Sequence, residues 1–253
     1  MDGERPTPRK RIAEPDRQAV LDAAALLQVR RTEIATALAE GRPVDAEIVG
    51  ASSKRRSQLF LEDQDSWTEL LSVRPAATSY QLRGSLPNTR RLLAAGLRMT
   101  SIYDADGVSP DARLLLAGER AGTYLVSVAP VQMKIVNREY VLLQGPFRDG
   151  QGTVMAVRSR PCLDAAWRYW EVVQKTAIAV GETVDPPAVL TPRQGQVVAL
   201  MASGANDNAI AVALGVSVRT VRSDVAGILD ALGVSSRFAA GVRLRKWTDG
   251  SSR

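Results

Sequence analysis

The sequence predicts an α/β domain with a mostly parallel sheet, followed by a smaller all-α domain of four helices. Two observations predict this division. Between residues 44 and 180, short β-like segments alternate with helical ones, which is typical of strands joined by crossover helices. Residues 181–187 (GETVDPP) then read as a linker, and residues 188–249 are rich in alanine and carry the start and stop signals of consecutive helices.

Composition excludes several classes of chemistry. The 253 residues include no histidine and one cysteine, Cys162. The chain therefore lacks an imidazole base, a Ser-His-Asp triad, a histidine metal ligand, an internal disulfide and a multi-cysteine zinc site. We expect no catalytic residue, no metal and no cofactor, and hence no enzyme. The net charge of +6 weakly favours nucleic acid or another anionic partner.

We expect a soluble, cytoplasmic protein that does not bind membranes. No apolar run approaches the ~18 residues of a membrane helix. The apolar stretch behind the basic cluster at residues 9–11 is interrupted by Asp22 and Gln28, unlike the core of a secretion signal.

The N-terminal residues predict a tail and a long helix. Residues 1–14 are basic, contain two prolines and predict a flexible tail. Residues 15–41 predict a helix with one narrow apolar stripe, which includes Leu27 and Ile34. Such a stripe suits either a dimer seam, which we favour, or packing against its own domain.

The block at 44–180 predicts a series of elements. We expect helices at residues 52–71, 88–96, 110–122 and 162–176. We expect strands at residues 46–49, 78–82, 97–103, 123–128, 133–136, 140–143 and 153–157. Asp104 and Asp106 follow a strand, where they favour a loop turn over a cation or phosphoryl site.

The C-terminal segment carries the clearest helix signals. Thr191, Pro192 and Gln194 predict a capping box with proline at the first helical position. Asn206 and Ser217 are good caps for two more helices, joined at Gly215, and Ser235 or Ser236 begins a fourth that reaches about residue 247. Two short helices joined by a tight turn predict a helix-turn-helix, whose third helix, 218–232, would lie in the DNA major groove.

The third helix divides into two faces. Val221, Val225 and Ile228 belong to the buried stripe, and Arg222, on the other face, could donate two hydrogen bonds to guanine. Asp224 is expected near the phosphates, where it would weaken binding or alter sequence preference. Residues 190–253 hold eight basic and four acidic side chains, a net charge of +4. The expected DNA-binding residues are Arg219, Thr220, Arg222, Ser223, Ala226, Asn206, Ser217 and Arg237.

The segment LTPRQGQVVALMASGANDNAIAVALGVSVRTVRSDVAGILDALGVSSRFAA resembles the LuxR/NarL-type helix-turn-helix almost end to end. The resemblance implies that the helix matching 217–232 reads DNA and that the fourth helix, with Val242 and Leu244, contributes to a dimer. Many members have Lys-Glu at Asn208-Ala209, histidine at Asp224 and a polar group at Ala226. The alternative is a helical hairpin used for protein contacts.

The front block is similar to a second family. The stretches LLAAGLRMTSIYD, ARLLLAGERAGTYLVSVAPVQMKIVNREYVLLQGP and VRSRPCLDAAWRYWEVV look like the phospholipase-D-like effector domain of TrmB-type regulators. The residues matching the phospholipase D motif are Gln132, Lys134 and Glu139, and glutamine cannot replace the nucleophilic histidine. The resemblance thus implies the fold without phosphodiesterase activity. We expect no counterpart of the winged helix of TrmB-type proteins, because few residues stand before the long helix in this sequence.

Together these observations predict a bacterial transcription regulator that binds a palindromic operator in double-stranded DNA as a homodimer. The front domain would sense a small-molecule effector or a partner, and RNA polymerase is a further candidate partner. Two alternatives are a phosphorylation-controlled response regulator and a DNA-binding protein whose front domain only dimerises. A phosphodiesterase is the least favoured.

Overall fold

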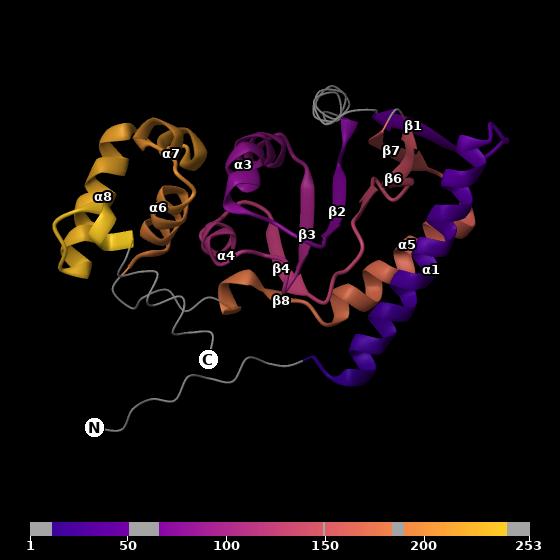
Figure 1. Cartoon of the computed structure of the whole chain (residues 1–253), viewed down its shortest axis with the longest axis horizontal. Coiled ribbons are helices and arrows are strands. Elements are labelled where there is room, and N and C mark those ends of the chain that lie inside the picture. Colours follow the sequence, from indigo (N-terminus) through magenta and orange to yellow (C-terminus); the bar gives the residue numbers. More distant parts are fainter. Residues whose placement is uncertain (1–11, 51–65, 149, 184–189, 242–253) are drawn as a thin grey trace.

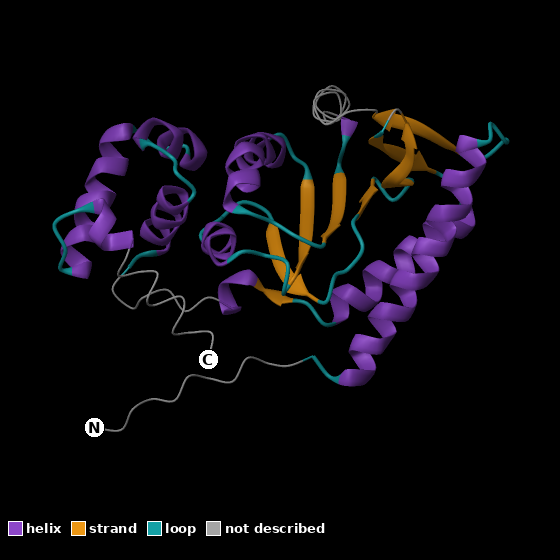
Figure 2. Cartoon of the chain, viewed as in Figure 1, coloured by secondary structure: helices purple, strands orange, loops and turns teal. Residues whose placement is uncertain are grey.

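The computed structural model describes residues 12–50, 66–148, 150–183 and 190–241. A mixed sheet occupies the middle of the molecule, with helices on both faces and three further helices packed at one end (Figures 1 and 2). The helices are α1 (Glu14–Ala39), α3 (Ser79–Ala94), α4 (Pro110–Ala117), α5 (Arg160–Lys175), α6 (Pro192–Ala202), α7 (Asp207–Leu214) and α8 (Val218–Leu232). The strands are β1 (Ala46–Gly50), β2 (Glu69–Arg74), β3 (Arg98–Asp104), β4 (Thr123–Ser127), β5 (Met133–Val136), β6 (Tyr140–Arg148), β7 (Gln151–Val157) and β8 (Ile178–Ala179).

The sheet is mixed, so the expectation of a mostly parallel sheet is wrong. Its order is β1-β7-β6-β5-β2-β3-β4-β8. Among the described strands only the β2–β3 and β3–β4 pairs are parallel, and the five other pairs are antiparallel. The β5–β6 and β6–β7 pairs are antiparallel because these strands follow one another along the chain without crossover helices. Three residues join β5 to β6, and two of them, Asn137 and Arg138, have positive φ angles of 50° and 65°, as in a type I′ turn.

Helix α1 packs inside its own domain, against α5 and the sheet. Leu27 is fully buried there and Ile34 is 8% exposed. Burying a leucine side chain contributes about 1.5–3 kcal/mol. The apolar stripe is therefore used within the chain, which corrects the expectation that Leu27 and Ile34 form a dimer seam.

Two expected elements of the front block are wrong. The end of the helix expected at 52–71 is strand β2, and residues 51–65 lie outside the described residues. The strand expected at 78–82 is the start of α3, because Thr78 and Gln81 form a capping box. Helix α4 is also shorter than expected, since it ends at Ala117. Helix α3 begins nine residues before the helix expected at 88–96, and the other expected strands and helices are present with ends shifted by up to five residues.

The linker expected at 181–187 begins inside a short 3-10 helix, η2 (Val180–Thr183), and residues 184–189 lie outside the described residues. Helix α6 then packs on α4, and α7 packs on α3. The buried side chains of these four helices form one hydrophobic cluster. The helices that follow the linker are therefore docked on the front domain.

Gln196 and Gly118 make the docking contact close. Gln196 is 5% exposed, and its Nε2 donates to the Leu115 carbonyl oxygen at 3.0 Å. This bond satisfies a carbonyl near the C-terminal end of α4, where helices leave carbonyls unpaired. A Cβ at Gly118 would lie 2.4 Å from the Gln196 side chain. Glycine at this position therefore lets α4 and α6 approach.

Candidate nucleic-acid interface

Helix α8 presents one exposed polar face, on the side away from α3 and α4 (Figure 1). Arg219, Arg222, Ser223 and Ala226 are exposed on this face, and Thr220 is partly exposed. The opposite face packs on α6 and α7. The buried residues there are Val221, Asp224, Val225, Ile228 and Leu232. The structure thus gathers the five α8 residues expected to bind DNA.

Local signals set the start and end of the two crossing helices. The Asn206 side chain accepts from the Ala209 N–H at 2.9 Å and caps α7. The Ser217 hydroxyl accepts from the Thr220 N–H at 3.1 Å and caps α8. Gly215, with φ of 66°, ends α7 in the left-handed conformation that glycine adopts at little cost. Asn206 and Ser217, both expected at the DNA, therefore fix where the helices begin.

Asp207, which sequence reasoning missed, connects three parts of this domain. Its carboxylate pairs with Arg237 at 2.8 Å and with Arg222 at 3.4 Å. The hydrogen bond from Arg237, together with the charges of both arginines, holds the pKa of Asp207 below its usual value. The one signal in the sequence was an acid in the first turn of α7.

Arg222 remains available for DNA. Its side chain is 72% exposed, and only its Nε approaches Asp207, at 3.4 Å. A guanidinium has five N–H donors, so the contact leaves four for a base edge.

Asp224 corrects an expectation, because it does not face the phosphates. Its residue is 7% exposed, and its two carboxylate oxygens accept from Arg193 Nε and Nη2 of α6 at 2.8 and 2.9 Å. Helical spacing explains the position, since Asp224 lies between Val221 and Val225 on the inner face. It joins α8 to α6 and removes no positive charge from the DNA face.

The remaining expected residues are more dispersed. Arg237 is exposed in the short helical segment 237–241, whose first turn is capped by Ser236. Val242 and Leu244 lie outside the described residues. In the front domain, Gln132 and Glu139 lie at opposite ends of β5, which contains Lys134.

The Asp104 carboxylate closes a turn, as the loop interpretation predicted. It accepts from the N–H groups of Asp106, Gly107 and Ala129 at 2.7 to 3.2 Å. Within residues 12–50, 66–148, 150–183 and 190–241, no cluster of three or more His, Cys, Asp or Glu residues could hold a metal ion. No helix among these residues is long and apolar enough to span a membrane.

Comparison with known proteins agrees with this geometry. Residues 188–243 match the family described as bacterial regulatory proteins, luxR family. This segment is therefore a LuxR-family helix-turn-helix domain. The chain is also 31% identical over 116 residues to the bialaphos biosynthetic pathway regulatory protein of Streptomyces hygroscopicus. That match spans 45% of this chain and 45% of the relative, so it covers less than half of the relative's length.

Two solved structures resemble the chain weakly. The phospholipase D family member Nuc from Salmonella typhimurium has a TM-score of 0.37 at 11% identity, covering 53% of this chain and 96% of that one. The phosphatidylserine synthase from Haemophilus influenzae has a TM-score of 0.38 at 12% identity, covering 63% of this chain and 44% of that one. At such scores neither likeness carries an argument, so the phospholipase-D-like and TrmB-like character of the front domain stays a prediction.

Proposed function

We propose that this protein is a sequence-specific DNA-binding transcription regulator that acts in the cytoplasm as a homodimer. The observation that carries the proposal is the exposed face of α8, with Arg219, Arg222 and Ser223 turned outward. The luxR family match over residues 188–243 supports the same function.

The chemistry of α8 assigns separate roles to its residues. Arg222 can donate two parallel hydrogen bonds to O6 and N7 of guanine and so read a base. Arg219, Thr220 and Ser223 carry donors that suit phosphate oxygens or base edges, and Ala226 has a methyl group that suits thymine. Arg237, paired with Asp207 beside α8, adds positive charge next to this face.

A homodimer would place two α8 helices in successive major grooves. A twofold pair matches a palindromic site whose half-sites lie about one helical turn apart. The fourth helix, with Val242 and Leu244, remains the proposed dimer seam, since the stripe of α1 is buried within the chain. RNA polymerase is a further proposed partner of the DNA-bound dimer.

The front domain would act without catalysis. Its role in the proposal is to sense an effector, and the docking of α6 on α4 supplies a direct route to the DNA-binding helices. A signal would change this packing, and with it the positions of the two recognition helices. The signal would thus pass through the packing of α6 on α4 as well as through the linker.

The proposal is tested by selecting genomic fragments with the purified full-length chain at two salt concentrations. We expect one enriched palindrome, which Arg222→Ala loses. Arg160→Ala is the matched control, because Arg160 is an equally exposed arginine on α5, in the front domain. Binding that ignores Arg222 and falls steeply with salt would mean phosphate attraction alone and would refute sequence-specific recognition.

A further inference from the structure

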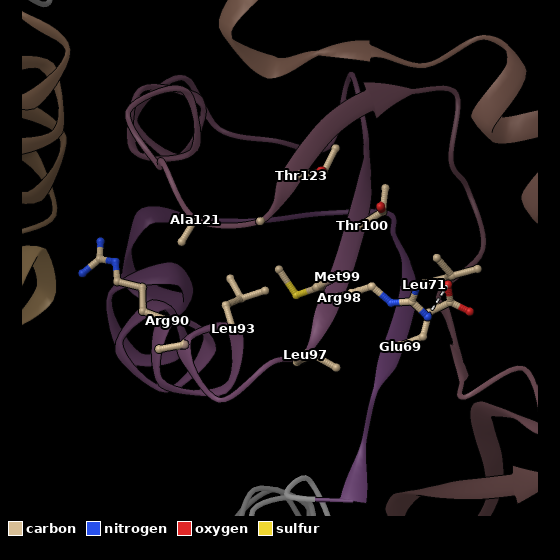
Figure 3. A pocket seen from close by; sticks show the side chains of 12 residues that line it. Glu69, Leu71, Arg90, Leu93, Leu97, Arg98, Met99, Thr100, Ala121 and Thr123 are labelled. Carbon is tan, nitrogen blue, oxygen red and sulfur yellow. Dashed lines mark ion pairs between the residues drawn. The ribbon is translucent and has the colours of Figure 1, made fainter.

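A pocket of about 620 Å³ lies where α3 passes into β3, beside the start of β4 (Figure 3). Pockets of 300–1,000 Å³ are typical of small-molecule sites. The wall mixes polar and apolar side chains, and the apolar Leu93, Leu97 and Met99 lie at its centre. The pocket belongs to the front domain and is separate from the exposed face of α8.

Gly122 keeps this space open. It adopts a positive φ of 81°, and a Cβ at this position would lie 3.1 Å from Leu93 Cδ1 and 3.2 Å from Met99 Cε. Such contacts are tighter than ordinary van der Waals distances. The backbone between α4 and β4 therefore approaches the apolar wall without filling it.

Glu69 and Arg98 line the pocket, and Arg138, which lies outside the lining, also pairs with Glu69. Glu69 pairs with Arg138 at 2.6 Å and, more loosely, with Arg98 at 3.8 Å. One carboxylate thus faces two guanidinium groups. Arg98 is 77% exposed and extends along the rim toward Glu69 (Figure 3). Arg98 is well placed for the head group of an anionic ligand, since guanidinium binds carboxylate strongly.

Arg90 connects this pocket to the DNA-binding domain. Its side chain lines the pocket, and its guanidinium points away from Leu93 (Figure 3). There it holds Glu119 through two hydrogen bonds of 2.7 and 2.8 Å and donates to the Ala213 carbonyl oxygen in the last turn of α7. A cation at the C-terminal end of a helix is favourable. The Arg90 side chain therefore contacts both the pocket and α7, so a movement of the pocket wall at Arg90 would be transmitted to α7.

We propose that this pocket binds a small amphipathic carboxylate, with its apolar body against Leu93, Leu97 and Met99 and its carboxylate on Arg98. Occupancy shifts Arg90 and so changes the hold of the front domain on α7. The coupling to DNA rests on the proposed function, whereas the binding of the ligand does not.

Ligand binding is tested first, on the full-length chain without DNA. Calorimetric titration with octanoate and 4-phenylbutyrate is compared with 1-octanol. We expect octanoate to bind about two- to fivefold more tightly than 1-octanol, because an ion pair with an exposed guanidinium contributes less than a tenfold gain in affinity. Arg98→Gln should remove this difference, and Ala121→Leu should weaken both ligands by filling the pocket. Arg160→Gln is the matched surface control.

Two results would overturn the binding site. One is the absence of binding by either acid at millimolar concentration, with the thermal unfolding of the protein intact. The other is equal binding of octanoate to the parent chain and to Arg98→Gln.

Coupling is tested on the operator recovered by fragment selection. We expect octanoate to change the affinity for that operator at least threefold in the parent chain. Glu119→Gln removes the charge that holds Arg90 and does not change the pocket lining, so this variant should still bind octanoate but lose most of the change in affinity. Unchanged DNA affinity in an octanoate-saturated parent chain would refute the coupling. Failure of DNA binding itself would instead refute the proposed function and leave the calorimetric result standing.

Discussion

The two sides of the helix-turn-helix domain have opposite character. The outer side of α8 is exposed and carries arginines with N–H donors that are not used within the domain. The opposite side of the domain, formed by α6 and α7, packs on α4 and α3. On the buried side, the Gln196 amide donates a hydrogen bond to a backbone carbonyl of α4. On the outer side, Arg222 makes one long hydrogen bond with Asp207. The domain thus has one exposed face, which the proposed function assigns to DNA, and one face that packs on the front domain.

This difference implies a division of roles. Changes on the docked side should alter how the two domains are held together and leave recognition intact. Changes on the outer side should alter recognition and leave folding intact. The predictions below break or sharpen this comparison.

The largest effect is expected from Gly118→Val on the docked side. The new side chain would overlap Gln196, whose atoms lie 2.4 Å from the position of a Cβ. Overpacking of this kind costs about 1–3 kcal/mol and should loosen the contact between α4 and α6. We expect a larger radius of gyration by small-angle X-ray scattering, with operator binding retained.

Gly41→Val is a matched control for that variant, because a Cβ at Gly41 meets no atom within 4 Å, although its φ of 70° adds local strain. An unchanged radius of gyration for Gly118→Val would show that the domains do not depend on this close approach.

Asp224→Asn should lower stability and spare sequence preference. The substitution breaks a two-bond pair with Arg193, whose side chain is about half exposed and remains solvated. We expect a loss of about 1 kcal/mol in the free energy of unfolding, measured by chemical denaturation. The preferred operator should be unchanged by fragment selection. A changed operator preference would instead mean that Asp224 contributes to DNA recognition.

Arg219→Ala should weaken binding uniformly. A residue that contacts phosphate contributes affinity without reading sequence, and its loss lowers the salt dependence by about one counterion. We expect equal losses on the operator and on a scrambled duplex, measured by fluorescence anisotropy at several salt concentrations. A loss confined to the operator would instead make Arg219 a base reader.

The smallest effect concerns pH and Asp207. Because its pKa is lowered in the folded state, this carboxylate contributes stability above its unfolded pKa and loses that contribution as pH falls through the folded value. We expect the difference in stability between the parent chain and Asp207→Asn to shrink below about pH 4, near the usual pKa of an aspartate. Denaturation midpoints at pH 7 and pH 3 measure this difference. A stability difference that is the same at both pH values would mean that the Asp207 carboxylate does not pair with the two arginines.

The helix-turn-helix could be predicted from sequence because its signals are local. Thr191, Asn206 and Ser217 cap helices in the structure, and Gly215 ends α7, as their positions in the sequence indicated. The face of α8 followed from helical spacing. Asp224 differs from the expectation because its position between two buried valines places it on the inner face of α8, although its charge suggested the exposed face.

The front domain was harder to predict because its structure depends on non-local pairing. Thr78 reads equally as a strand residue or a helix cap, and only its bonds with Gln81 decide. Alternating elements indicate a sheet, but they do not reveal that β2 pairs antiparallel with β5. The docking of Gln196 on Leu115 joins residues 81 positions apart, and no local pattern marks it.

The most direct test of the central claim is the affinity of Arg222→Ala for the selected operator and for the same operator with one guanine pair replaced in each half-site. We predict that the variant binds the two duplexes equally, while the parent chain prefers the first by about 1–3 kcal/mol for each replaced pair. If the variant kept the full preference of the parent chain, Arg222 would not read a base, and the outer face of α8 would not be the recognition surface.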